Sequence, residues 1–172
     1  MLDMYLDIIT IKKIASGPDS VIHYELEKLE RIARDAGVCF LSPIYLDLDF
    51  KPSGENYLIQ GHLKTEVEQL CSRCLKDYAH TIVADICGIL TEDVDWYQLK
   101  AQEGNIYLLD QGFNLMPLVV EAIILNLPIS PHCGANCQGL CPICGINRNI
   151  ATCDCEPRDT DPRWEKLKKI KK

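Results

Sequence analysis

The sequence lacks the features of membrane and secreted proteins. No apolar run approaches the roughly 18 to 20 residues that cross a bilayer. The first residues, Met1-Leu2-Asp3-Met4-Tyr5, carry an acid where a signal peptide has a basic region. We therefore expect a cytoplasmic protein with no membrane partner. The composition, 47% hydrophobic and 25% charged, is that of an ordinary folded chain.

The common catalytic motifs are also missing. The chain has no GxGxxG, GxxxxGK, HExxH or GxSxG segment. The acid pairs Asp47/Asp49 and Asp93/Asp95 are more typical of solvated faces and turns than of a catalytic pair. We therefore expect no enzyme and no small-molecule substrate.

Positive charge is scarce outside the C-terminal end. Residues 163–172 hold six bases and one acid, a net charge of +5. The net charge of the whole chain is −7, so residues 1–162 carry −12. Such an acidic body argues against broad non-specific binding of nucleic acid, which depends on many contacts to phosphate. Only the basic end is suited to an anionic partner.

Hydrophobic patterning predicts an α+β fold, an antiparallel β-meander with a buried helix. Alternation of apolar and polar residues indicates half-buried strands. Residues 20–36 fit either a strand or a helix, and we favour a helix near 26–35. Residues 91–104 indicate a loop or a weak helix. The expected strands are 4–11, 44–51, 57–68, 76–90 and 106–109.

Two further helices are expected towards the C-terminus. Asn114 is predicted to cap a helix over 114–126, with Pro117 in its first turn, and this helix is apolar all round and hence buried. Asp161 and Pro162 predict the start of an amphipathic helix that carries the lysines. We therefore divide the chain into a sheet domain, 1–130, and a cysteine-rich segment with a basic helix, 131–172.

Ten cysteines in a chain expected to be intracellular indicate metal binding, because reducing compartments do not sustain structural disulfides. CxxC knuckles such as Cys71–Cys74 and Cys141–Cys144 point two thiolates at one tetrahedral ion. We expect two zinc ions, the first held at the tip of a hairpin and the second in a compact loop. The first set is Cys71, Cys74, Cys133 and Cys137, and the second is Cys141, Cys144, Cys153 and Cys155.

Several alternatives stay open for these cysteines. The spacing of Cys137, Cys141 and Cys144 matches the iron–sulfur motif of radical-SAM enzymes. A CxxC pair can also be a redox centre. His132 could replace a neighbouring thiolate as ligand. Cys39 and Cys87 lie in apolar runs and are expected to be packing residues.

The C-terminal third resembles the bacterial and plastid family of large ribosomal RNA subunit accumulation proteins, which are YceD-like. The resemblance rests on the helix before Leu127-Pro128, the block from Gly139 to Asn147, the pair Cys153/Cys155 and Asp161-Pro162-Arg163. Upstream, Cys71-x-x-Cys74-Leu75 also fits. The resemblance implies a role in making or stabilising large-subunit (23S) ribosomal RNA, and it implies no catalytic activity.

Two functions follow from the resemblance and the charge distribution. The first is a non-enzymatic ribosome-assembly factor whose metal-stabilised platform and basic end touch RNA. The second is a zinc-stabilised module that engages a basic ribosomal protein through the acidic body without touching RNA. The candidates for contact with RNA or a partner are Arg148, Arg158, Arg163, Lys166, Lys168 and Lys169.

Overall fold

The computed structural model describes residues 4–17, 20–27, 33, 37–100, 102 and 104–156. The chain divides into two compact units, of which one comprises 1–69 and 77–129, and the other 70–76 and 130–172. The expected helix after Asp161 lies outside the described residues, as does most of the expected helix near 26–35.

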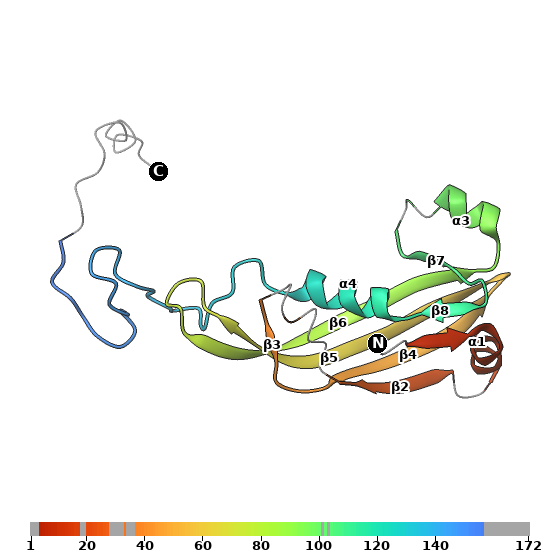
Figure 1. Cartoon of the computed structure of the whole chain (residues 1–172), viewed down its shortest axis with the longest axis horizontal. Coiled ribbons are helices and arrows are strands. Elements are labelled where there is room, and N and C mark those ends of the chain that lie inside the picture. The colour runs from red at the N-terminus through yellow and green to blue at the C-terminus, as the bar shows by residue number, and fades with distance from the viewer. Residues whose placement is uncertain are drawn as a thin grey trace. The chain divides into compact units, whose positions relative to one another are not determined.

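The first unit is built on a mixed sheet with strand order β2-β4-β5-β6-β7, in which β3 pairs with β5 (Figure 1). Pairing is antiparallel from β2 to β4 and from β4 to β5, whereas β6 and β7 are parallel. The α+β class is confirmed, but the sheet is not purely antiparallel. Its strands are β2 (Val21–Leu26), β3 (Cys39–Phe40), β4 (Ile44–Ser53), β5 (Asn56–Leu70), β6 (Asp77–Thr91) and β7 (Ile106–Leu108).

One face of this sheet forms the core. Ile44, Leu46, Leu48 and Phe50 of β4 are fully buried, while the residues between them point to the open face. Gly61 of β5 lies opposite Leu48, and a Cβ there would come within 2.0 Å of the backbone oxygen of β4. The strands therefore approach so closely at this point that no side chain fits.

The N-terminal segment differs from its prediction. The expected strand 4–11 is a short strand, β1 (Tyr5–Asp7), followed by a helix, α1 (Ile8–Ala15), and β1 pairs with β8 (Gly112–Asn114). Asp7 caps the helix, because its carboxylate accepts the N–H (2.8 Å) and the hydroxyl (2.7 Å) of Thr10. This capping outweighs the β propensity of the isoleucines.

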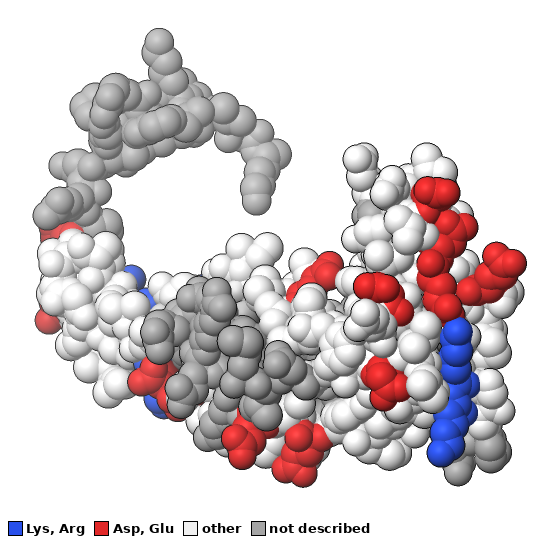
Figure 2. Space-filling view, turned by 45° about the vertical axis from the view of Figure 1, so that its right-hand side comes forward, with Lys and Arg blue, Asp and Glu red and all other residues white. Residues whose placement is uncertain are grey.

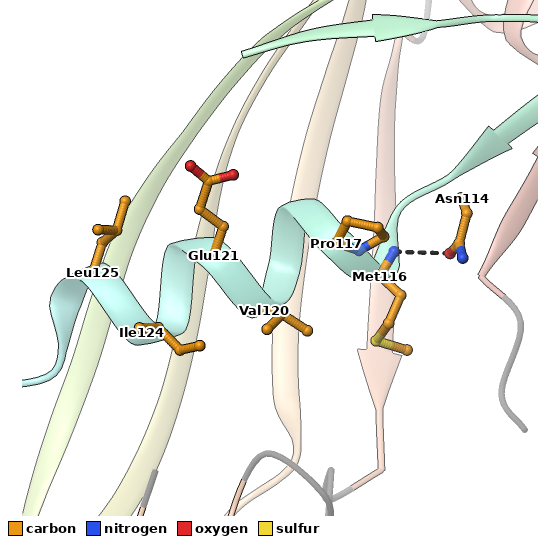
Figure 3. Close-up of a pocket in the computed structure, with 7 residues that line it drawn as sticks. All are labelled: Asn114, Met116, Pro117, Val120, Glu121, Ile124 and Leu125. Carbon is orange, nitrogen blue, oxygen red and sulfur yellow. Dashed lines mark hydrogen bonds between the residues drawn. The ribbon is translucent and has the colours of Figure 1, made fainter. Parts of the chain in front are cut away.

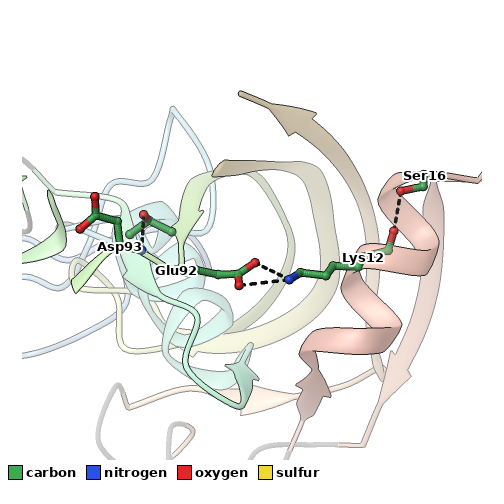
Figure 4. Close-up of polar contacts among 5 residues, drawn as sticks. Lys12, Ser16, Glu92 and Asp93 are labelled. Atoms are coloured by element: carbon green, nitrogen blue, oxygen red, sulfur yellow. Dashed lines mark hydrogen bonds and ion pairs between the residues drawn. The ribbon is translucent and has the colours of Figure 1, made fainter. Parts of the chain in front are cut away.

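A side-chain contact joins α1 to the end of β6. The ammonium of Lys12 lies 2.8 and 3.0 Å from the two carboxylate oxygens of Glu92, which immediately follows the strand (Figure 4). Residues 91–104 were predicted to form a loop or a weak helix, and the structure has a helix there, α3 (Val94–Lys100). Its first turn is held by Asp93, whose carboxylate accepts the N–H groups of Asp95 and Trp96.

Helix α4 (Met116–Asn126) packs along the core face of the sheet (Figure 1). It is not buried all round as predicted: Leu118, Val119, Ala122 and Ile123 are buried, but Leu125 is 74% exposed. Leu115 is the N-cap, and Asn114 lies one residue before it with its side-chain oxygen accepting the N–H of Met116 (3.0 Å). An open groove runs over the exposed side of the helix (Figure 3), lined by Asn114, Met116, Pro117, Val120, Glu121, Ile124 and Leu125.

The isolated cysteines also differ from their prediction. Cys39 and Cys87 are exposed rather than packed in the core. Strand alternation explains this, because each occupies the open-face position next to a buried neighbour, Phe40 or Ile86.

Acidic side chains are prominent on the surface view (Figure 2). Among the described residues, no helix is both long and apolar enough to cross a bilayer.

Candidate metal centre

The second unit brings eight cysteines together in two groups of four. Within each group the sulfur atoms all lie within 4.8 Å of one another, and none of the ten cysteines forms a disulfide. The grouping is the one favoured by the sequence. The first cluster is Cys71, Cys74, Cys133 and Cys137, and the second cluster is Cys141, Cys144, Cys153 and Cys155.

Sulfur separations in the first cluster suit a tetrahedral ion. The sulfurs of Cys71 and Cys137 are 3.8 Å apart, and those of Cys74 and Cys133 are 3.6 Å apart. Four sulfurs at about 2.3 Å from a central zinc are separated from one another by about 3.8 Å. The cluster could therefore hold such an ion with little rearrangement.

The first knuckle, residues 71–76, is a closed turn. The N–H of Leu75 donates to the carbonyl of Cys71 (2.9 Å), and the N–H of Cys71 donates to the carbonyl of Lys76 (2.9 Å). These bonds wrap the backbone around the sulfur of Cys71, which is fully buried. Hydrogen bonds within residues 71–76 thus hold the turn that carries Cys71 and Cys74.

The second knuckle, residues 141–146, repeats the same bonds. Gly145 donates to the carbonyl of Cys141 (2.9 Å), and Cys141 donates to the carbonyl of Ile146 (2.8 Å). Both knuckles need a left-handed residue at the fifth position. Gly145 provides it at φ 75°, whereas Leu75 adopts φ 58° despite its side chain. The two knuckles are therefore equivalent in geometry but unequal in strain.

The first thiol of each CxxC knuckle has a lowered pKa. Burial raises the pKa of Cys71, but N–H groups of Cys133, Cys74 and Arg73 outweigh this effect and lower it to about 6. N–H groups of Cys144 and Ile143 likewise lower the pKa of Cys141 to about 6.

Another thiol of each cluster has a raised pKa. Hydrogen bonding to Cys74 and Cys137 raises the pKa of Cys133 to about 12, and hydrogen bonding to Cys144 helps to raise that of Cys155 to about 12. Ionised sulfurs this close repel one another, so only a bound cation would let all four ionise.

Backbone hydrogen bonds tie the first knuckle to the cysteine-rich segment of the same unit. The N–H of Ser72 donates to the carbonyl of Pro131 (2.8 Å), and the N–H of Leu140 donates to that of Arg73 (3.0 Å). Among residues 130–156, all of which are described, there is no helix and only one isolated β-bridge, between Leu140 and Asn147. The segment therefore owes little of its shape to regular structure.

Two residues outside the clusters donate to their sulfurs. Asn149 donates its amide to the sulfur of Cys137 (3.4 Å), and Arg148 directs its guanidinium at that of Cys141 (3.6 Å). Arg148 was among the predicted contacts with RNA or a partner, and the structure places it against the second cluster. Asn149 was missed because residues that support ligands follow no fixed spacing.

The Nδ1 atom of His132 contacts the carbonyl of Ser130 (3.0 Å), and His132 belongs to neither cluster. A groove of about 480 Å³ borders the first cluster, with Lys76, Asn136 and Asn149 among its polar lining residues. The remaining predicted contacts lie outside the described residues, namely Arg158, Arg163, Lys166, Lys168 and Lys169.

Fold and site together define an α+β protein with two four-cysteine clusters that could each hold a metal ion. Residues 59–171 match the family described as large ribosomal RNA subunit accumulation protein YceD. The match spans all eight clustered cysteines and more than half of the chain. This protein belongs to the YceD family, as its sequence resemblance predicted.

The chain is also similar to several curated proteins. Uncharacterized proteins of Mycobacterium bovis and Mycobacterium tuberculosis are 29% identical over 81% of this chain. The chain spans 65% of the length of these mycobacterial relatives. A chloroplastic YCED homolog 1 of Zea mays, named as a large ribosomal RNA subunit accumulation protein, is 22% identical over 69% of this chain and 50% of its own length. No solved structure matches the chain.

Proposed function

We propose that this protein is a cytoplasmic, non-enzymatic ribosome-assembly factor that supports the synthesis, processing or stability of large-subunit ribosomal RNA. The observation that carries the proposal is the family match, which covers both cysteine clusters. The family's description names ribosomal RNA and no chemical reaction. The mechanism that we propose is therefore one of binding and not of catalysis.

Zinc is the metal that we propose for both clusters. Four thiolates in a closed tetrahedral set favour zinc or iron–sulfur over harder cations such as magnesium and calcium. Each knuckle directs backbone N–H groups at its first sulfur, as expected for ligands that carry negative charge. Iron would give a coloured protein, so elemental analysis together with the visible spectrum distinguishes the two metals.

In this mechanism the metals hold the second unit as a rigid platform next to the basic end. The expected RNA contacts are Arg158, Arg163, Lys166, Lys168 and Lys169, and Arg148 would contribute its charge from beside the second cluster. Because unit 1 is acidic, we expect the basic end to supply most of the attraction to phosphate.

The direct test is the salt dependence of RNA binding. The full chain and a variant with Lys166, Lys168 and Lys169 changed to Gln would be titrated with large-subunit ribosomal RNA fragments at several salt concentrations. Losing three contacts to single-stranded RNA should reduce the slope of log affinity against log salt by about 2. An unchanged slope would exclude the basic end as the RNA-binding element.

The acidic surface supports a second candidate, a module that binds a basic ribosomal protein without touching RNA. Asp85 on the open face of the sheet has a side chain that is 86% exposed, and residues 1–162 carry a net charge of −12. Crosslinking in cells, with a Cys141→Ser variant alongside, separates the candidates. Recovery of ribosomal proteins without RNA would favour this second function, and recovery of ribosomal RNA would favour the first.

A further inference from the structure

One short run of chain is shared by both clusters. Only three residues separate Cys137 of the first cluster from Cys141 of the second. The run is held from both sides, because Leu140 donates to the carbonyl of Arg73 (3.0 Å) and the carbonyl of Gly139 accepts the N–H of Arg148 (2.9 Å). Whatever fixes this run for one cluster therefore also positions a ligand of the other.

The turn of residues 147–149, which we call the bridging turn, touches sulfurs of both clusters. Asn149 donates to the sulfur of Cys137 (3.4 Å), and the next residue back, Arg148, donates to that of Cys141 (3.6 Å). The two donors are consecutive, so neither can move far without the other.

The carboxamide of Asn149 is oriented by its neighbours. Its oxygen accepts the N–H of Gln138 (2.9 Å), and its amide nitrogen also donates to the side-chain oxygen of Asn147 (2.8 Å). That same oxygen of Asn147 accepts the N–H of Asn149 (3.0 Å). The donor to Cys137 is thus fixed by hydrogen bonds to Gln138 in the shared run and to Asn147 in the bridging turn.

We propose that the bridging turn couples the two clusters, so that metal ions load them cooperatively. This inference rests on the metal binding proposed above. An ion in the first cluster fixes Cys137, and with it the shared run that positions Cys141 and the turn that directs Arg148 at the sulfur of Cys141. Residues 130–156 contain no helix that could pre-form either site. The coupling is reciprocal, so loading the second cluster must favour loading the first to the same extent.

The test is a titration of the metal-free full-length protein with Cd²⁺. Native mass spectrometry counts chains with no, one and two ions, and ¹¹³Cd NMR gives each cluster its own resonance. At half-saturation we expect fewer one-ion chains than a random distribution gives, and we expect both resonances to grow together. A random distribution, or filling of one cluster before the other, would overturn the coupling.

Variants of Asn149 test its role as a positioning residue. Asn149→Ala should weaken the first cluster about 10- to 100-fold, and should also weaken the second, whose sulfurs Asn149 does not touch. Asn149→Asp keeps an acceptor for Gln138 but offers no N–H to Cys137, and it should show the same two losses. Thr152→Ala removes an exposed polar side chain of the same segment, outside the shared run and the bridging turn, and serves as the control.

The outcomes separate the coupling from the function on which it rests. If Asn149→Ala weakens only the first cluster, the turn supports a ligand but does not couple the sites, and the inference is wrong. Uptake of Cd²⁺ without cooperativity overturns the coupling alone. Failure of the wild-type chain to take up any Cd²⁺ overturns both the coupling and the proposed metal function.

Discussion

Removing the metal should unfold the second unit and leave the first unit folded. The perturbation is a chelator, or Cys141→Ser, which removes a buried ligand. Structural zinc contributes about 10 kcal/mol or more of apparent folding free energy. The buried apolar residues among the described part of this unit are Cys71, Cys74 and Cys141. Burial of even a large aliphatic side chain yields about 1.5–3 kcal/mol, so these three cannot replace one metal ion.

Hydrogen exchange followed by mass spectrometry reads the two units separately. On chelation, amides in 130–156 should lose protection, while those of β4, β5 up to Gln69 and β6 should keep it. Cys87→Ser is the matched control, since it changes an exposed cysteine on the open face of the sheet and should alter neither unit. Protection in 130–156 that survives verified removal of all metal would refute the argument that thiolate-bound metal shapes this segment.

Four substitutions at single positions test local features of the two units. Gly61→Ala should destabilise the sheet by about 1–3 kcal/mol or more, measured by urea unfolding, because the added Cβ meets the backbone of β4. Burial lowers the pKa of His80, whose ring nitrogens have no hydrogen-bond partner within the described chain. Stability should therefore decline as pH falls below the unfolded histidine value of about 6.5, and His80→Phe should remove that decline in urea unfolding at about pH 5 and 8. In chelator competition, Gly145→Ala should weaken the second cluster about 10-fold, since a left-handed residue costs about 1–2 kcal/mol. Leu75→Gly should leave the first cluster unchanged or tighter.

Local sequence patterns predicted the central strands well and the two ends of the first unit less well. Strict alternation over 44–51 is a direct readout of one buried and one open face, and β4 follows it. The prediction of a strand over 4–11 was wrong because it rested on composition. The carboxylate of Asp7 caps a helix that begins at Ile8. The exposed side of α4 could not be seen either, because an apolar sequence does not show how much of a helix the sheet covers.

Cysteine spacing located the candidate ligands because a knuckle is a local structure. Residues 71–74 and 141–144 form the same turn from the same CxxC pattern. Pairing of distant cysteines was less determined, and the choice rested on loop size. The contact of Arg148 could not be predicted from the sequence. Its charge suggested contact with a partner, whereas in the structure its guanidinium nitrogen lies 3.6 Å from the sulfur of Cys141.

Metal binding changes the charge available for RNA. A zinc ion held by four thiolates is a group of net charge −2, so two such sites add −4 to the second unit. By sequence, 70–76 and 130–172 together carry ten bases and five acids, which leaves +1 after both sites are filled. Without residues 163–172 the same unit is at −4. Both units then repel phosphate, so any electrostatic affinity for RNA depends on this basic end. Attraction to a basic protein does not need it, so deleting 163–172 should abolish RNA binding yet preserve protein binding, as measured by equilibrium titration with each partner.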